Sequence, residues 1–334
     1  MKKVIIAIHG LGNKPEAALL EDGWLKAIHE GLDLAGKSRR KVPFNMVYWA
    51  DISHPEPLDP AVDDPESPRF LKEPYAPSPP GRAPAKPRRF RPYVLRWIER
   101  NMDRLFLKKN MAETFPGASA KMMERYFSEL DTYYTDECRS LRDEDCSAKA
   151  AIQARARAVF AEYAGHEILL LSHSMGSIIA FDALWPPDSG VAVHTFVTLG
   201  SPLGLPPIVA RNAQAQRAVF PELTKPKAPD GVWPLWYNLS DRRDTVALDH
   251  TLRDDYAANR RGLKAVDLFV ENDYEIDGHA NPHKSYGYLR TPEVAGIIDA
   301  FLSDRRTDRL SRNYRRIKEL VHRKLRGRGA ETPS

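Results

Sequence analysis

Short apolar runs alternate with longer amphipathic patterns along much of the chain. Six of the short runs are rich in β-branched and aromatic residues, which is typical of strands in a mainly parallel sheet. They are "KVIIAIHG" (3–10), "FNMVYWAD" (44–51), "EILLLSHS" (167–174), "HTFVTLGS" (194–201), "PLWYNLSD" (234–241) and "AVDLFVEN" (265–272). Helical patterns follow most of them, over 16–35, 147–164, 174–185 and 291–303. This alternation predicts an α/β fold, a doubly wound and mainly parallel six-stranded sheet with helices on both faces.

One long segment, residues 53–146, interrupts this alternation between the second and third predicted strands. Its first part, 53–92, contains 12 of the 27 prolines and is expected to form an extended, irregular loop. From residue 93 the pattern becomes helical, with apolar residues on one face. We therefore predict an insertion in a domain that spans 1–304, with the helices of 93–146 packed as a cap over the carboxyl edge of the sheet. An extension of the core away from that edge is the alternative.

Composition narrows the class of protein. The chain is 42% hydrophobic and 28% charged, which is typical of globular proteins. No apolar run approaches the roughly 20 residues of a membrane-spanning helix. The two cysteines, Cys138 and Cys146, do not indicate a disulfide framework. The opening "MKKVIIAIHG" has an apolar run shorter than the roughly 7–15 residues of a signal-peptide core, so we expect a cytoplasmic protein.

The basic charge of the chain is concentrated in its C-terminal tail (305–334). Residues 304–328 hold 11 Lys and Arg against 3 Asp and Glu, which leaves 39 basic and 42 acidic residues elsewhere. Residues 305–326 are predicted to form an amphipathic helix whose apolar stripe docks on its own domain or on a second subunit. Contact with an anionic membrane surface is the main alternative. Nucleic acid is disfavoured, because the chain has no recognised nucleic-acid-binding motif.

The segment "LLLSHSMGSIIA" (169–180) leads from a predicted buried strand into a predicted buried helix through small residues. Ser174 lies two residues after Ser172 and two before Gly176, which is the spacing of a G-x-S-x-G nucleophile elbow with serine in place of the first glycine. Small residues let the strand fold sharply against the helix, with the serine at a helix N-terminus that favours negative charge. We therefore predict that Ser174 is a nucleophile. An ordinary tight turn is the competing interpretation.

A serine nucleophile needs a general base, and the base needs an acid that orients it. The acid is expected just after "PLWYNLSD", where Asp244 is favoured over Asp241, whose other interpretation is a turn-forming residue. The base is expected before the final helix. There His283 is favoured over His279, because it lies closer to that helix.

A metal site is a competing interpretation of the same loop. His279 and His283 are four residues apart and Asp277 is close by. However, Asn281-Pro282 between them would break any helix that aligned the two rings, so no metal is expected.

An oxyanion hole requires two backbone N–H groups beside the nucleophile. One is expected from Met175. The other is expected from Leu11, because the glycines of "GLG" (10–12) let the backbone approach a ligand. A dinucleotide or phosphate loop is disfavoured, because Pro15 stands where a third glycine would be needed and no G-x-x-x-x-G-K-S/T motif occurs. We expect His9 to brace this loop.

These pieces together resemble the α/β-hydrolase superfamily over most of residues 1–304, and its lipase and esterase branches in particular. The matching pieces are "HGLG" (9–12), "SHSMG" (172–176), "TLGSPLG" (198–204), Asp244 and His283. The missing first glycine departs from the pattern, and the two strands that usually precede the "HG" strand are absent, which implies a compact six-stranded sheet.

The resemblance implies a serine hydrolase that cleaves a small carboxylic ester or acyl substrate through an acyl-enzyme, with no cofactor. Three alternatives stay open: an acyltransferase, a thioesterase, and a binding protein that has a hydrolase-like fold without turnover. A binding protein of this kind usually lacks a member of the triad, and here each role has a candidate residue.

Overall fold

A computed structural model of the 334-residue chain describes most of its first 303 residues. The predicted tail helix lies outside the described residues, and so does nearly all of the predicted cap, so both stay predictions. The described residues are 1–37, 41, 43–78, 130, 133–134, 148–185 and 189–303.

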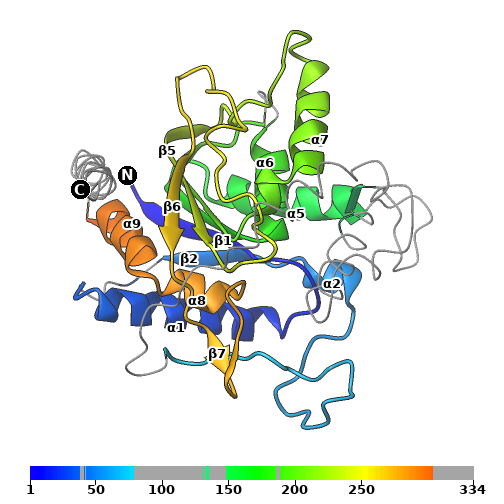
Figure 1. Ribbon diagram of the computed structural model, residues 1–334, viewed down its shortest axis with the longest axis vertical. Coiled ribbons are helices and arrows are strands. Elements are labelled where there is room, and N and C mark those ends of the chain that lie inside the picture. The colour runs from blue at the N-terminus through cyan, green and yellow to red at the C-terminus, as the bar shows by residue number, and fades with distance from the viewer. Residues whose placement is uncertain are drawn as a thin grey trace, which may run out of the picture.

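A parallel sheet of six strands occupies the centre of the described part of the chain, in the order β2-β1-β3-β4-β5-β6 (Figure 1). Each strand overlaps one of the six predicted strands. They are β1 (Lys3–Ile8), β2 (Phe44–Val47), β3 (Glu167–His173), β4 (Val193–Leu199), β5 (Val232–Asp241) and β6 (Val266–Val270). The predicted α/β architecture, with its mainly parallel six-stranded sheet, is confirmed.

Helices cover both faces of this sheet (Figure 1). One face packs against α1 (Ala17–Leu34), α8 (Ser285–Leu289) and α9 (Pro292–Leu302). The other packs against α5 (Ala148–Glu162), α6 (Met175–Leu184) and α7 (Pro206–Arg217). Shorter elements are α2 (Ala50–Ser53), the 3-10 turn η1 (Pro202–Gly204), and the hairpin of β7 (Glu275–Ile276) and β8 (His279–Ala280).

The apolar runs of the strands are continuous because each strand is buried on both faces. In β1, Val4, Ile6 and Ile8 belong to the core beneath α5 and α6, while Ile5 and Ala7 belong to the core beneath α1. All five side chains are almost fully buried. The core therefore has two layers, and the sheet separates them.

The described part of the proline-rich segment, 53–78, runs irregularly, as its composition predicts, and it contacts the body at several points. Near its start it pairs with the chain after β1 through an isolated bridge between Pro15 and Leu58. Its later part, residues 68–78, is called the strap below. Three hydrogen bonds fix the far end of the strap: Ser78 N to Glu30 Oε1 (2.7 Å), Tyr274 Oη to Pro74 O (2.6 Å) and Arg290 Nη1 to Ala76 O (2.6 Å).

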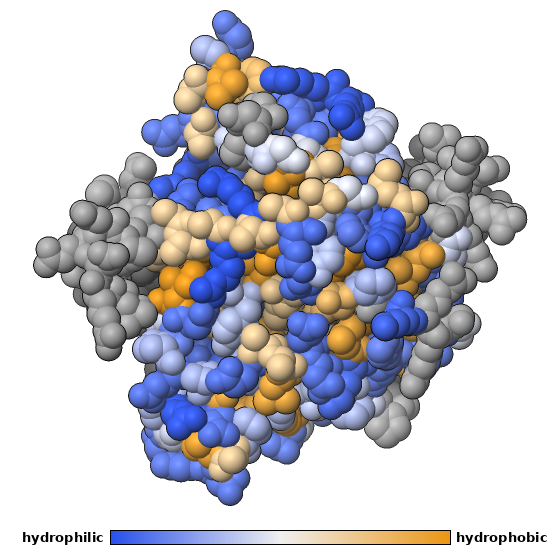
Figure 2. Space-filling model, turned by 180° about the vertical axis from the view of Figure 1, so that it is seen from behind, coloured by the Kyte–Doolittle hydropathy of each residue, from blue (hydrophilic) through white to orange (hydrophobic). Residues whose placement is uncertain are grey.

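Only Leu130, Tyr133 and Tyr134 of the predicted helical insertion are described, and they pack in the layer of α5 and α6. Among the described helices, none has the length and apolar character needed to cross a membrane. Over the face seen in Figure 2, hydrophobic and hydrophilic residues are interspersed, as on most globular proteins.

The packing of α1 depends on a glycine, and this generates a stability prediction. A Cβ atom at Gly31 would lie 2.7 Å from Arg290 Cα and 2.8 Å from its carbonyl oxygen. We therefore expect Gly31→Ala to lower the free energy of unfolding by about 1–3 kcal/mol, because backbone must move to admit the methyl group.

Gly296 in α9 is the matched control, since a Cβ there meets nothing within 4 Å. Gly296→Ala should raise the free energy of unfolding by about 0.5–1 kcal/mol through the better helix propensity of alanine. Urea unfolding followed by circular dichroism measures both values. Equal effects of the two substitutions would contradict the proposed close packing at Gly31.

Candidate active site

Ser174 occupies a sharp turn between β3 and α6. Its backbone has φ 54° and ψ −129°, a positive φ that costs a non-glycine residue on the order of 1–3 kcal/mol. A Cβ atom on Gly176 would lie 2.6 Å from the carbonyl oxygen of His9, and one on Gly10 would lie 2.8 Å from Ser174 Cβ. Ser172, in the place of the first glycine of the motif, is fully buried and donates to Val197 O (3.2 Å). The turn therefore has the strained, crowded geometry expected of an elbow.

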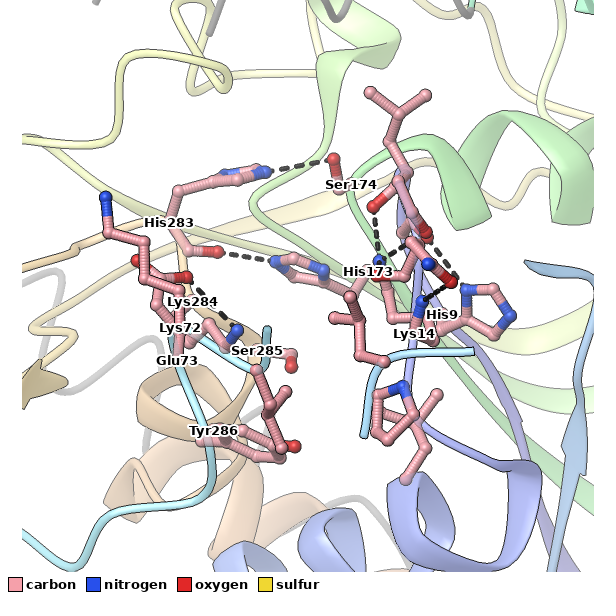
Figure 3. A pocket seen from close by; sticks show the side chains of 18 of the residues that line it. His9, Lys14, Lys72, Glu73, His173, Ser174, His283, Lys284, Ser285 and Tyr286 are labelled. Carbon is pink, nitrogen blue, oxygen red and sulfur yellow. Dashed lines mark hydrogen bonds and ion pairs between the residues drawn. The ribbon is translucent and has the colours of Figure 1, made fainter. Parts of the chain in front are cut away.

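A continuous chain of hydrogen bonds joins Ser174, His283 and Asp244 (Figure 3). His283 Nε2 lies 2.9 Å from Ser174 Oγ, and His283 Nδ1 lies 2.8 Å from Asp244 Oδ2 and 3.0 Å from Oδ1. With a neutral imidazole, Nδ1–H donates to the carboxylate and Nε2 accepts from the serine hydroxyl. The structure thus brings together the three residues that the sequence favoured for nucleophile, base and acid.

The two alternative residues lie outside this chain. Asp241 accepts from Arg243 N (2.7 Å) and Arg243 Nε (3.0 Å), which is the turn-forming role considered for it, and also from Asn272 N (2.7 Å). His279 is exposed on β8, where its Nδ1 lies 2.9 Å from Asp277 O. Among the described residues, no group of three or more His, Cys, Asp or Glu side chains is arranged to hold a metal ion.

Tyr288 of α8 supports the acid, and the sequence carried no signal for it. Its hydroxyl donates to Asp244 Oδ2 (2.7 Å) and accepts from Asp241 N (2.9 Å). Burial and the charge of Asp244 raise the pKa of Tyr288 well above its usual value, so the phenol keeps the proton that it donates. Val246 N adds a bond of 2.8 Å to Asp244 Oδ1. Both carboxylate oxygens of Asp244 therefore accept hydrogen bonds that fix its orientation.

His173 fixes the backbone that carries His283. Its Nε2 donates to the carbonyl oxygen of His283 (2.6 Å), and the centroids of the two rings are 4.8 Å apart. Burial, and then the neighbouring His283, lower the pKa of His173 well below its usual value. His173 is therefore neutral, and its single N–H proton is on Nε2.

His9 braces the loop after β1, as expected. Its Nδ1–H donates to Gly10 O (2.8 Å), its Nε2 accepts from Trp49 N (3.0 Å), and its ring stacks on the Trp49 indole. Burial, and then the charge of Lys14, lower the pKa of His9, which keeps this tautomer neutral. The carbonyl of Gly10 shares a peptide unit with the N–H of Leu11, so the bond from His9 polarises that N–H.

Lys14 closes the same loop from its other side. Its ammonium donates to the carbonyl oxygens of Leu11, Gly12 (2.9 Å) and Asn13 (3.4 Å). Leu11 lines a pocket together with Ser174. Met175 begins α6, and N–H groups in the first turn of a helix have no acceptor within the helix. The two expected oxyanion donors thus lie on the segments that flank Ser174.

The pocket above Ser174 has a volume of about 560 Å³. Its walls come from the loop after β1, from α1, from the strap and from the segment around His283 (Figure 3). Apolar side chains include Leu20, Trp24, Phe70, Leu71, Val246 and Tyr286, and polar ones include Asn13, Lys14, Lys72, Glu73, Asn281 and Lys284. The sequence did not indicate that the proline-rich segment would form one wall.

Glu73 connects the strap to the segment that carries His283. Its carboxylate accepts from Asn281 Nδ2 (2.9 Å) and pairs with Lys284 Nζ (3.1 Å). Asn281 Oδ1 in turn accepts from the backbone N–H of His283 (3.0 Å). Burial alone would raise the pKa of Glu73, but Lys284 and Asn281 outweigh it and the pKa is lowered.

Comparisons with known proteins do not place the chain in a family. No family model matches it, and no curated protein matches it. The interpretation of the site therefore depends on its residues and on their geometry.

The lowered pKa of Glu73 predicts a pH-dependent contribution to stability. A carboxyl group whose pKa is lower in the folded than in the unfolded state stabilises the fold. This contribution is complete above the unfolded pKa of about 4.3, and it is lost as the pH falls through the lower folded pKa. Glu73→Gln should therefore lower the free energy of unfolding by up to about 1 kcal/mol at neutral pH, and by less as the pH falls below about 4. Chemical unfolding at a series of pH values measures this difference.

Glu66→Gln is the control, because Glu66 is an exposed residue of the same proline-rich segment. It should leave the free energy of unfolding unchanged across the series. A Glu73→Gln effect that is independent of pH would contradict the role assigned to the ionised carboxylate.

Proposed function

We propose that the protein is a serine hydrolase of the α/β-hydrolase type, which cleaves carboxylic esters with Ser174, His283 and Asp244. The observation that carries the proposal is the hydrogen-bonded chain from Ser174 Oγ through His283 to Asp244. Its position adds support, because Ser174 follows a central parallel strand at the carboxyl edge of the sheet and lines a pocket. Active sites of open α/β sheets are typically found at that edge.

In the proposed reaction, Ser174 Oγ attacks the ester carbonyl carbon while His283 Nε2 takes the hydroxyl proton. The carbonyl oxygen becomes an oxyanion, which the N–H groups of Leu11 and Met175 stabilise. As the intermediate collapses, the bond to the alcohol oxygen breaks and His283 returns the proton to the leaving alcohol. Asp244 orients the imidazole and stabilises its protonated form.

The acyl-enzyme is then hydrolysed by the same groups. His283 takes a proton from a water molecule, whose oxygen attacks the acyl carbon. The second intermediate collapses with release of the carboxylic acid, and the proton returns to Ser174. A thioesterase would differ in the leaving group and an acyltransferase in the acceptor, so product analysis separates both from an ester hydrolase.

Ser174→Ala tests the nucleophile. We expect a fluorophosphonate probe to label the wild type and not the variant, and kcat on p-nitrophenyl esters to fall by about 10⁴–10⁶. Circular dichroism and the unfolding midpoint check that the variant is folded. Labelling of a folded Ser174→Ala protein, or retention of most of its esterase activity, would overturn the proposal.

Two pairs of substitutions test the base and the acid. His283→Ala and Asp244→Asn should each lower kcat by roughly 10³–10⁵, because the base or its orientation is lost. The matched controls His279→Ala and Asp241→Asn change the neighbouring residues of the same types. The histidine control should leave kcat unchanged, and the aspartate control should act mainly on stability through Arg243. A larger kcat loss in either control would reassign that role.

A further inference from the structure

Charged side chains of one sign dominate the pocket wall. The charged residues that line it, within the described part of the chain, are Lys14, Lys72 and Lys284, and one acid, Glu73. Glu73 is already engaged by Lys284 and by Asn281. Figure 3 shows Lys72 and Lys284 on the His283 side of the pocket and Lys14 on the opposite side. The lining side chains therefore present a net positive charge from two directions.

This positive charge acts on two buried histidines that line the pocket. Lys14 lowers the pKa of the buried His9, and it also contributes, after burial and His283, to the lowered pKa of His173. Both histidines line the pocket beside Ser174. An anion bound in this pocket would thus meet a favourable field in a partly desolvated site, where charges interact more strongly than in water.

We propose that the pocket selects esters that carry an anionic group, a carboxylate or a phosphate-like group, which the net positive charge of Lys14, Lys72, Lys284 and Glu73 attracts. The apolar side chains of the same pocket, Trp24 among them, contact the chain that links this anion to the ester. The proposal rests on the proposed function, since it names the substrate class of that same site.

Pairs of matched esters measure the preference. The first pair is p-nitrophenyl hexanoate, which ends in a methyl group, and p-nitrophenyl hydrogen adipate, which ends in a carboxylate. The methyl ester of the adipate compound is uncharged and controls for size. We expect kcat/KM to be about ten-fold higher for the anionic ester at low salt, the size expected of a few partly exposed ion pairs. The ratio should approach one at about 1 M salt, where the Debye length is about 3 Å.

Two further probes locate and identify the anion. Comparison of p-hexanoyloxybenzoate with its methyl ester tests an anion on the alcohol side of the ester. The p-nitrophenyl ester of ω-phosphonohexanoate tests a phosphate-like group on the acyl side. A ratio above one for any pair assigns the anion to that position. If the anionic-to-neutral ratio of kcat/KM is one or less for every pair, the proposal is overturned. If hydrolysis of the hexanoate ester still depends on Ser174, the proposed function stays intact.

Substitutions of opposite sign separate the charge effect from a packing effect. Lys72 is exposed, and Lys72→Glu should lower the anionic-to-neutral ratio about five- to ten-fold, more than Lys72→Met. Glu73→Gln should raise the ratio, because it removes the acid from the wall. Lys26→Met is the control, since Lys26 is another exposed lysine, paired with Asp22 on α1 and outside the pocket lining. Equal ratios in all four variants would contradict the proposal.

A binding measurement decides the proposal independently of turnover. In Ser174→Ala, calorimetry should give tighter binding for monomethyl adipate than for methyl hexanoate. The indole Nε1–H resonance of Trp24, assigned with Trp24→Phe, should shift saturably as monomethyl adipate is added. Equal or weaker binding of the anionic ester, or an unchanged Trp24 resonance, would overturn the proposal even if Ser174 proved not to be a nucleophile.

Discussion

Around Ser174 the backbone that leaves β3 reverses against the end of β1 so closely that two positions have no room for a side chain. A Cβ on Gly176 would meet the carbonyl oxygens of Ile8 and His9, and one on Gly10 would meet Ser174 itself. This contact holds Ser174 at a positive φ, because any relaxation of the turn would have to move the strand beside it. It also brings the loop that carries Leu11 next to the serine hydroxyl. Ser174 and the loop that carries Leu11 are thus placed by one backbone contact.

The parts of the fold that follow from local patterns were predictable from the sequence. β1 and β3 are buried on both faces, so their apolar runs are continuous, and the small residues after β3 mark the sharp turn at Ser174. Asp244 and Asp241 could only be ranked, since both follow β5 and their roles depend on the turn between them. In the structure, Asp241 Oδ1 accepts from Arg243 N while Asp244 reaches His283. The local turn geometry therefore separates the residue that the sequence favoured from its alternative.

The strap was not predictable in the same way, because its contacts join residues that are far apart in the chain and have no periodic pattern. Glu73 meets Asn281 and Lys284 across more than two hundred residues. Proline-rich composition correctly indicated irregular backbone, but it cannot specify which surface an irregular segment will cover. Tyr288 was not predicted for a related reason. A buried tyrosine in a short helix has the pattern of any core residue, and only the structure shows that its hydroxyl donates to Asp244.

The charges around the proposed triad are divided in a way that suits its chemistry. Lys14 is bonded to the loop that carries Leu11, where its field would favour the negative charge that the proposed reaction develops on the ester oxygen. The same field would oppose the positive charge that His283 acquires in the proposed reaction. Asp244 would counter this through its contact with Nδ1, and Tyr288 donates a hydrogen bond to the same carboxylate. His173, which packs against His283, is held neutral by burial, so it adds no second positive charge at the moment of proton transfer. A pocket lined by lysines and the proposed histidine base could therefore share one site, because the carboxylate of Asp244 is buried directly behind the imidazole.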